Sequence, residues 1–474
     1  MKKPFTEEIT LEKIVGGGQA LGSIADGRKA FVWGGLPGEK VAVSFHKQKR
    51  NYVEGVVQEV LTASKEREQP RDPECYLSTS PWQIMSFGSE QHYKAALIEE
   101  AFEMHDIVLP GSIDVYSDGE IYEYRNKVEF SFWWDNDREE LDLAFFRRGS
   151  QGKIPVEGTT LAKPEINQLA LKILDILRTK EIEARNLKTL MIRADQQGNC
   201  VFQLYVKEKG FQPLTEEDFT STSAQGGEVI YSDHRSPASV ITKRLASWGE
   251  TALTDTVLGV PFRYVCEGFF QGNIPVYEQS LRDMQKWVED DTSFDEDSAF
   301  PAERDKTNDP LASRASEAKA GAVRPNADVD AKKQTIPVVD MYSGVGSIGF
   351  TIGGDDLTLV EINKSAIDEM KRNRYELGKK ATIIETSSEA AVDYITSDAL
   401  IIVDPPRAGL HGDVIDRLLE VKPARIIYLS CNPVTQARDV KYLAEAYGIR
   451  HHRGYNFFPR TPHIEHLVIL DLKG

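Results

Sequence analysis

The stretch Ile336-Pro-Val-Val-Asp-Met-Tyr-Ser-Gly-Val-Gly-Ser-Ile-Gly349 decides the fold of the last third of this 474-residue chain. A short apolar run ends in Asp340 and leads into a glycine-rich turn, a pattern typical of the first strand and helix of a nucleotide-binding α/β sheet. Helical periodicity follows over Lys364–Leu377 and Asp413–Val421. Three further apolar runs each end in a reactive residue: Leu357–Glu361, Ala399–Asp404 and Arg425–Cys431. Apolar strands that alternate with helices predict a Rossmann-like parallel sheet, buried on both faces.

Reactive side chains stand at the ends of these predicted strands. Ligands of such a sheet bind at the carboxyl ends of its strands, so Asp340, Glu361, Asp404 and Cys431 are expected to share one site. The chain closes with Glu465-His-Leu-Val-Ile-Leu-Asp471, in which a carboxylate precedes an apolar strand. If that last strand runs antiparallel, its start lies on the same edge and Glu465 joins the site.

The glycine turn allows two cofactors. Gly344-x-Gly346-x-x-Gly349, with Glu361 about 20 positions on, matches the dinucleotide fingerprint and would suggest a dehydrogenase. The carboxylate of Asp340 favours S-adenosylmethionine instead, because that cofactor carries a cationic amino group and a sulfonium but no pyrophosphate. Glu361 can hold ribose hydroxyls in either case.

Two motifs at neighbouring strand ends supply chemistry: Asp404-Pro-Pro-Arg-Ala-Gly409 and Ser430-Cys-Asn-Pro-Val-Thr435. Methylation of uracil carbon 5 needs a thiol that adds to carbon 6 and a base that removes the carbon 5 proton. Cys431 and Glu465 fit these two roles, although a lone cysteine is more often a buried apolar residue. Asp404 can bond the cofactor or the base, and Arg407 can pair with Asp404 or with an RNA phosphate.

The amino-terminal region differs in pattern from the carboxyl-terminal third. Short strands over residues 1–64 predict a small β-barrel, and residues 65–267 mix strands and helices as in an α+β domain. The expected barrel strands are Ile9–Ile14, Lys29–Trp33, Lys40–Phe45 and Tyr52–Val60. Barrels of this size often bind oligonucleotides through charge and stacking, although a solvated hairpin also explains a basic tract. The candidate RNA-binding side chains are Lys47, Lys49, Arg50, Arg125, Lys127, Arg147, Arg148 and Arg407.

Charge and composition limit the kinds of partner that the protein can bind. Lysine and arginine minus aspartate and glutamate give 57 − 74 = −17, so RNA binding must rest on local basic patches. Part of the acidic excess lies at about 289–333, which reads as a disordered insertion in a methyltransferase domain of residues 268–474. No apolar run long enough to cross a membrane occurs, and the four scattered cysteines fit a reducing cytoplasm.

Taken together, the motifs resemble the RNA uracil-5 methyltransferase family over nearly the whole chain. The resembling segments are Phe269-Phe-Gln-Gly-Asn273, Asp340–Gly346, Asp404–Gly409, Ser430–Pro433 and Phe458-Pro-Arg-Thr-Pro-His-Ile-Glu465. The resemblance implies that Cys431 is the nucleophile and Glu465 the base. It also implies cofactor contacts by Gln271, Tyr342, Ser347, Glu361 and Asp404, beside the glycines Gly344 and Gly346.

The amino-terminal barrel looks like a TRAM domain, which ribosomal-RNA members of the family carry. We therefore expect 23S ribosomal RNA as the substrate, with transfer RNA or a non-catalytic role in RNA folding or ribosome assembly as alternatives. Further expectations are a monomeric cytoplasmic enzyme that acts on neither DNA nor membranes.

One departure concerns an iron–sulfur cluster that many relatives bind through four cysteines. Here Cys75 is followed by Tyr-Leu-Ser-Thr-Ser-Pro-Trp-Gln83, and the fourth position falls near Thr159. One thiol cannot hold a four-thiolate cluster, so we expect no cluster and no other metal. Trp82 and its neighbours are expected to fill the gap, while Cys200 and Cys266 are expected to be structural.

Overall fold

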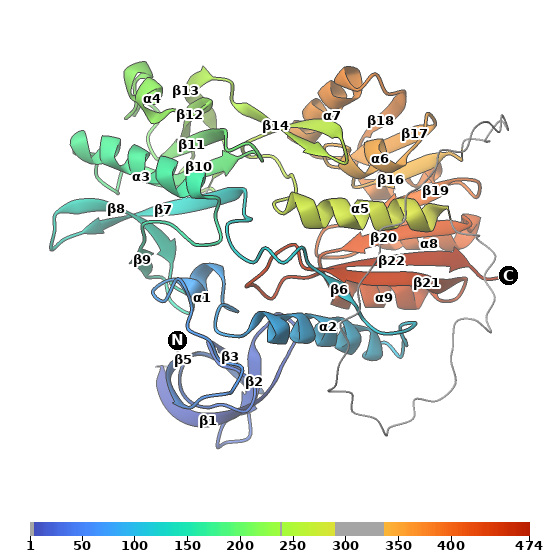
Figure 1. Ribbon diagram of the computed structural model, residues 1–474, viewed down its shortest axis with the longest axis horizontal. Helices are drawn as coiled ribbons and strands as arrows, with labels where there is room; N and C mark the ends of the chain where they lie inside the picture. Colours follow the sequence, from blue (N-terminus) through green and yellow to red (C-terminus); the bar gives the residue numbers. More distant parts are fainter. Residues whose placement is uncertain (1–3, 238, 290–335) are drawn as a thin grey trace, which may run out of the picture.

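The computed structural model describes residues 4–237, 239–289 and 336–474. The predicted acidic insertion at about 289–333 lies outside the described residues, apart from its first position. Figure 1 shows a small amino-terminal barrel, a central α+β part and a carboxyl-terminal α/β part along the chain. The predicted fold class is thereby confirmed.

The amino-terminal strands pair in the order β1-β2-β3-β5-β4 and close into a barrel. Side chains alternate between its apolar interior and solvent, as a half-buried strand requires. The barrel contains one strand more than the sequence predicted, because β2 is too short to show periodicity. Its strands are β1 (Phe5–Ile14), β2 (Ala20–Ser23), β3 (Lys29–Trp33), β4 (Lys40–Gln48) and β5 (Tyr52–Thr62).

The central part is a seven-stranded sheet in the order β13-β12-β11-β10-β7-β8-β9, with α3 packed against β8 and β10. The hairpin of β14 and β15 leads from this sheet to the carboxyl-terminal part, where β15 packs on α7. The strands are β7 (Lys127–Asp135), β8 (Glu140–Phe146), β9 (Lys153–Pro155), β10 (Leu187–Ala194), β11 (Cys200–Val206), β12 (Gly226–Tyr231), β13 (Lys243–Gly249), β14 (Ala252–Val257) and β15 (Val260–Val265). The helices are α1 (Tyr76–Thr79), α3 (Pro164–Thr179) and α4 (Glu216–Thr222).

The carboxyl-terminal sheet has the order β18-β17-β16-β19-β20-β22-β21-β6. Strands β16 to β20 are parallel, and β22 runs antiparallel to β20, as the site required. The strands are β16 (Val338–Met341), β17 (Leu357–Glu361), β18 (Ala381–Glu385), β19 (Leu400–Val403), β20 (Arg425–Ser430), β21 (Tyr447–Tyr455) and β22 (Glu465–Leu472). The helical segments are α5 (Ile274–Val288), α6 (Ser347–Ile352), α7 (Lys364–Glu376), η2 (Ser388–Ala390), η3 (Val392–Tyr394), α8 (Gly412–Val421) and α9 (Pro433–Leu443).

Two elements that precede the central sheet in sequence pack on the carboxyl-terminal sheet. Helix α2 (Phe87–Glu103) lies against α9, and β6 (Val115–Tyr116) pairs with β21 in parallel. In Figure 1 the blue α2 lies beneath the red and orange elements, far from the green central sheet. The segment from α2 to β6 therefore belongs structurally to the carboxyl-terminal part.

Helix α2 carries a fully buried ion pair. The Lys94 ammonium lies 3.0 Å from the Glu90 carboxylate, and both side chains are 0% exposed. The same two groups hold the segment between β21 and β22: Lys94 donates to Asn456 Oδ1, and Glu90 accepts from Asn456 Nδ2 and the Arg460 amide. Buried charges are stable only when their partners are in place, so this pair fixes the segment that precedes Glu465.

Replacing one partner of this pair tests its importance. In Lys94→Met the Glu90 carboxylate stays buried without its cation, so the free energy of unfolding should fall by about 3–5 kcal/mol. Lys13→Met breaks the exposed pair between Lys13 of β1 and Glu100 of α2 and should cost less than about 1 kcal/mol. Urea denaturation measures both, and equal losses would contradict this role.

Candidate active site

The glycine-rich turn after β16 has a backbone that only particular residues tolerate. Gly346 caps α6 with φ 85°, and a Cβ there would lie 2.5 Å from the Phe350 ring. Gly349 packs against Leu359, where an added Cβ would come within 2.4 Å. Tyr342 adopts φ 66°, a conformation that costs an aromatic residue energy and often occurs at functional sites.

A cavity of about 40 Å³ opens at the carboxyl ends of β16 and β19. Most of the predicted cofactor residues line it: Gln271, Tyr342, Gly344, Ser347 and Asp404. Phe269, which is 65% exposed, also lines it, and the Tyr277 hydroxyl lies 2.7 Å from Ser347 Oγ. The sequence analysis did not identify Tyr277, because a tyrosine within an amphipathic helix is ordinarily a core residue.

Asp340 is not among the residues that line this cavity. Its carboxylate is 0% exposed, and Oδ2 accepts the Gly349 amide at 2.9 Å while Oδ1 has no partner among the described residues. Burial raises the pKa of Asp340 well above its ordinary value. The Asp340 carboxylate therefore anchors the start of α6 and does not face the cavity.

Glu361 ends β17 and bonds three backbone amides. Oε2 accepts from Gly344 at 2.8 Å, and Oε1 accepts from Ile362 and Asn363 at 2.9 and 2.7 Å. These contacts join the glycine turn to the next strand end. A ligand that takes up Glu361 must replace at least one of these bonds.

Cys431 and Glu465 are brought together by strand register. Ser430 of β20 pairs with His466 of β22, and the next step in that register puts Cys431 opposite Glu465. Opposite residues in antiparallel strands have Cα atoms roughly 4.5–5.5 Å apart and side chains on one face. Glu465 is 6% exposed and Cys431 half-buried, so the pair lies at the rim of the sheet edge.

The electrostatics of this pair are dominated by burial and by neighbouring carboxylates. Burial, Glu465 and Asp404 raise the pKa of the Cys431 thiol to about 11, whereas Arg407 lowers it. Burial followed by Asp404 raises the pKa of Glu465 well above its ordinary value, and burial raises that of Asp404 to about 7. Four reactive groups therefore influence one another at one strand edge.

Three side chains of the central part hold the segment that enters the cavity; Lys127 was expected to bind RNA, and no sequence motif singled out Asn126 or Arg193. Arg193 donates to the carbonyls of Val265, Gly268 and Phe270, and Asn126 donates to the carbonyl of Gln271. Lys127 also reaches Gly268 O at 3.4 Å. Arg193 is fully buried, with its guanidinium 4.4 Å from the Tyr264 ring centre.

The candidate RNA-binding residues separate into two groups. Lys127 points at Gly268, and burial lowers its pKa to about 8, while Lys47 is paired with Glu54 at 2.6 Å. Side chains in the second group are free of carboxylate partners among the described residues. They are Lys49, Arg50, Arg125, Arg147, Arg148 and Arg407.

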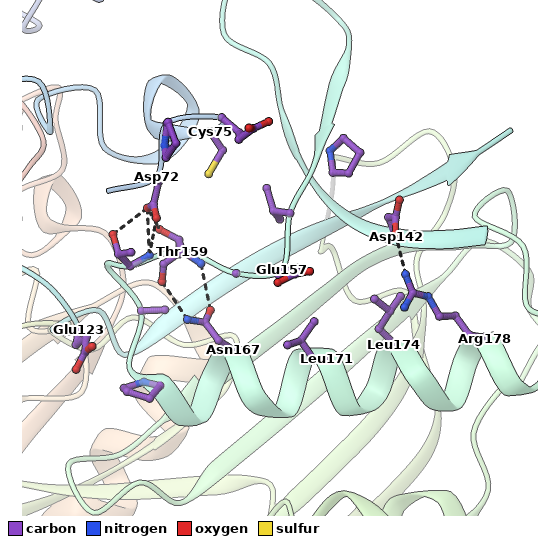
Figure 2. A pocket seen from close by; sticks show the side chains of 18 of the residues that line it. Asp72, Cys75, Glu123, Asp142, Glu157, Thr159, Asn167, Leu171, Leu174 and Arg178 are labelled. Carbon is purple, nitrogen blue, oxygen red and sulfur yellow. Dashed lines mark hydrogen bonds and ion pairs between the residues drawn. The ribbon is translucent and has the colours of Figure 1, made fainter. Parts of the chain in front are cut away.

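The segments that correspond to the iron–sulfur cluster site of relatives line a cavity of about 760 Å³ beside α3. Figure 2 shows Cys75 at its rim and Asp72 bonded to the loop that contains Thr159. Asp72 Oδ2 accepts from Thr159 Oγ1 and the Thr160 amide at 3.0 and 3.1 Å, and from Gln83 Nε2 at 3.1 Å. Among the described residues no group of three or more potential metal ligands occurs, and Cys75 is the one thiol at this cavity. The donor set does not fit a four-thiolate cluster.

Trp82 does not fill this gap, contrary to expectation. Its indole donates to Gly18 O at 3.0 Å and packs in the barrel core, because Gly18 leaves room for it. Asp72 makes the connection between the two loops instead. Cys75, Cys200 and Cys266 are buried, and burial raises the pKa of each to about 12.

Comparison with known sequences places residues 390–473 in the tRNA (Uracil-5-)-methyltransferase family model. An uncharacterized RNA methyltransferase of Nitratidesulfovibrio vulgaris is 26% identical, over 99% of this chain and 96% of the relative. One of Enterococcus faecalis is 24% identical, over 93% and 92%. The resemblance to RNA uracil-5 methyltransferases is thereby confirmed.

A solved structure shares the fold along the whole chain. It is the Pyrococcus abyssi tRNA (uracil-54, C5)-methyltransferase in complex with S-adenosyl-L-homocysteine, with a TM-score of 0.73 and 19% identity. The match covers 98% of this chain and 100% of the other.

Among the described residues, no helix combines the length and apolarity needed to cross a membrane.

The reactivity of Cys431 tests the electrostatics of the site. Thiolate is the alkylated form, so reaction with iodoacetamide should accelerate about tenfold per pH unit from pH 8 towards the pKa of about 11. Arg407→Gln removes the cation that lowers this pKa and should slow alkylation at pH 9. Mass spectrometry of the Cys431 peptide measures the rate, with the exposed Arg282→Gln as the matched control. Unchanged or faster alkylation in Arg407→Gln would contradict the assignment.

Proposed function

We propose that this RNA methyltransferase transfers a methyl group from S-adenosylmethionine to carbon 5 of a uracil in RNA. The observation that carries the proposal is the register of β20 and β22, in which a half-buried thiol stands opposite a buried carboxylate. This pair lies at the same strand edge as the cavity lined by Asp404 and the glycine turn. A thiol and a base beside a cofactor cavity are the minimum set for methylation of an unreactive pyrimidine carbon.

The reaction uses Cys431 and Glu465 in sequence. The Cys431 thiolate forms a bond to uracil carbon 6, and the electron pair of the double bond moves towards carbon 5, which takes the methyl group. Glu465 then removes the proton from carbon 5. The electron pair of that C–H bond restores the C5–C6 double bond, and the thiolate leaves. The target base must first leave its stack, at a cost of a few kcal/mol.

The cofactor is assigned to the cavity of Gln271, Tyr342, Ser347 and Asp404, with Glu361 as the group for ribose hydroxyls. When bound, S-adenosylmethionine supplies an electrophilic methyl group on a cationic sulfur. The carboxylates suit that charge: Asp404 lines the cavity, and its raised pKa of about 7 reflects burial without a cation. S-adenosyl-L-homocysteine in the Pyrococcus abyssi enzyme supports this assignment.

Protonation controls the thiol. Burial of the thiol, followed by the nearby Glu465 and Asp404, raises the pKa of Cys431 and keeps it protonated at neutral pH in the free protein, which protects it from oxidation and adventitious alkylation. Arg407 opposes this rise in pKa without reversing it. Asp404 or Glu465 can accept the thiol proton as the base enters.

The barrel and the central part are assigned to RNA binding, through Lys49, Arg50 and Arg147 at exposed turns. Aromatic side chains accompany them, because Phe31 and Tyr52 make an edge contact on the barrel surface. Charge and stacking together suit single-stranded or flipped-out RNA. We propose that no iron–sulfur cluster is bound and that Asp72 replaces its connection between the two loops.

Ribosomal RNA of the 23S type is the proposed substrate, because the barrel resembles the module of ribosomal-RNA members. Transfer RNA is the second candidate, since the Pyrococcus abyssi enzyme matches 98% of this chain, barrel included. Incubation of both transcripts with labelled cofactor separates the two, and mass mapping of methylated uridines then gives the position. RNA binding without incorporation into either transcript would favour an assembly factor.

Two substitutions test the mechanism. Cys431→Ala should abolish methylation, because no other group can add to carbon 6, and tritium transfer from labelled cofactor measures it. Retained turnover would refute the mechanism. Cys200→Ala, which removes a buried thiol in the central sheet, should keep activity.

Glu465→Gln should slow turnover by about 10²–10⁴-fold, because an amide cannot take the carbon 5 proton. The thiol should still add and the methyl group transfer, so a covalent protein–RNA adduct should accumulate and survive on a denaturing gel. The exposed Glu445→Gln at the end of α9 is the matched control and should form no adduct. Slow turnover without an adduct would rule out Glu465 as the base.

A further inference from the structure

The segment 456–463, here called the junction loop, connects β21 to β22 and touches every part of the molecule. From the central part, the Tyr124 hydroxyl donates to Pro459 O at 2.9 Å. From the barrel, Gly18 lies so close to Pro462 that a Cβ at Gly18 would fall 2.1 Å from it. The loop therefore marks the point where the three parts meet, two residues before Glu465.

His463 is the last residue of the junction loop, and its ring has a polar partner. Arg407 Nη2 lies 3.2 Å from His463 Nδ1. A guanidinium only donates, so Nδ1 accepts and the single proton of a neutral ring stays on Nε2. Burial, followed by Arg407, Lys94, Arg125 and Arg148, lowers the pKa of His463 to about 4, which keeps the ring neutral. The ring thus presents an N–H donor among cations.

Arg407 contacts the His463 ring, and the charges of Arg125 and Arg148, which come from two other segments, also lower its pKa. Arg407 follows β19, Arg125 precedes β7 beside the Tyr124 hydroxyl, and Arg148 follows β8. The Arg148 guanidinium lies 4.1 Å from the ring centre of Trp33 in the barrel and donates to Leu77 O. Aromatic and carbonyl contacts orient this side chain without neutralising it.

No carboxylate among the described residues forms an ion pair with any of these three arginines. Arg138, Arg178 and Arg244, by contrast, each contact acidic groups within ion-pair distance. Lys94 also faces the junction, but Glu90 compensates its charge. Guanidinium groups that converge without a carboxylate bind anions well, and their planar fork matches phosphate.

We propose that Arg125, Arg148 and Arg407, with the Nε2–H of His463, form a site for an RNA phosphodiester group at the entrance to Cys431. The inference rests on the proposed function and names how the target strand is held. Asn432, the residue after the thiol, donates to Arg407 O at 2.9 Å, so the site borders the nucleophile directly. A flipped nucleotide brings its own phosphates to this rim, where each neutralised phosphate contributes to salt-dependent affinity.

Salt dependence of RNA binding tests the site in the full chain. The probe is a fluorescently labelled, uridine-containing RNA strand, titrated at KCl concentrations between about 50 and 200 mM. Arg125→Gln and Arg148→Gln should each weaken binding and reduce the slope of log Kd against log salt by about 0.7–1 unit. Arg185→Gln, an exposed arginine paired with Glu183 in the central part, should leave the slope unchanged. Binding of S-adenosyl-L-homocysteine by calorimetry verifies that each variant is folded.

Replacing one phosphodiester of the RNA probe by an uncharged linkage makes the test specific for phosphate. With a methylphosphonate at the linkage beside the target uridine, the wild-type protein should lose the same slope, and Arg125→Gln or Arg148→Gln should cause little further loss. Weaker binding with an unchanged slope would overturn the proposal, because it indicates a contact to a base. Unchanged binding in both variants would overturn it as well. The binding readout needs no methyl transfer, so a wild-type protein that methylates no RNA refutes the proposed function while this test still decides the site.

Discussion

The buried contact of Glu90 and Lys94 with Asn456 and Arg460 is the constraint on which the site depends. Helix α2 has no catalytic residue, yet its two opposite charges bond the backbone and side chains of the junction loop. Arg460 adopts φ 63°, a strained conformation that persists because its amide and guanidinium are both bonded. Since β22 begins with Glu465, the position of this carboxylate is set from outside its own sheet.

The register of β20 and β22 brings Glu465 next to Cys431. In a sheet that was parallel throughout, Glu465 would stand at the opposite end of its strand from Cys431. Because β22 runs antiparallel to β20, its first residue, Glu465, lies next to Cys431, the residue that follows β20. The resulting proximity has an electrostatic cost, because Asp404 and Glu465 disfavour the thiolate and each other. Arg407 is the compensating cation, and its exposure lets an RNA strand reach the same group.

Much of this arrangement follows from local pattern. Apolar runs that end in Asp404 and Cys431 predicted parallel strands, and the glycine spacing predicted the turn before α6. Long-range contacts left no such signal. The pairing of β6 with β21 involves two residues, and the local pattern of α2 does not show that its buried face contains Glu90 and Lys94. Asp340 was interpreted as a ligand for a cation because sequence shows that a carboxylate ends a strand but not which way it turns. Asp72 was overlooked because its partners Thr159 and Gln83 lie far apart in sequence.

Arg193 and Asn126 tie the central part to the segment 265–271 that leads into the cavity of the carboxyl-terminal part. Both residues belong to the central part, whereas the carbonyls that they hold lead directly to Gln271 in the cofactor cavity. The central part also contributes Arg125 and Arg148 to the junction. Loss of these bonds would leave the carbonyls of segment 265–271 and the buried Arg193 guanidinium without partners, which is costly away from solvent. The central sheet is therefore attached both to the segment that lines the cavity of Gln271 and, through Tyr124, to the junction loop that precedes Glu465.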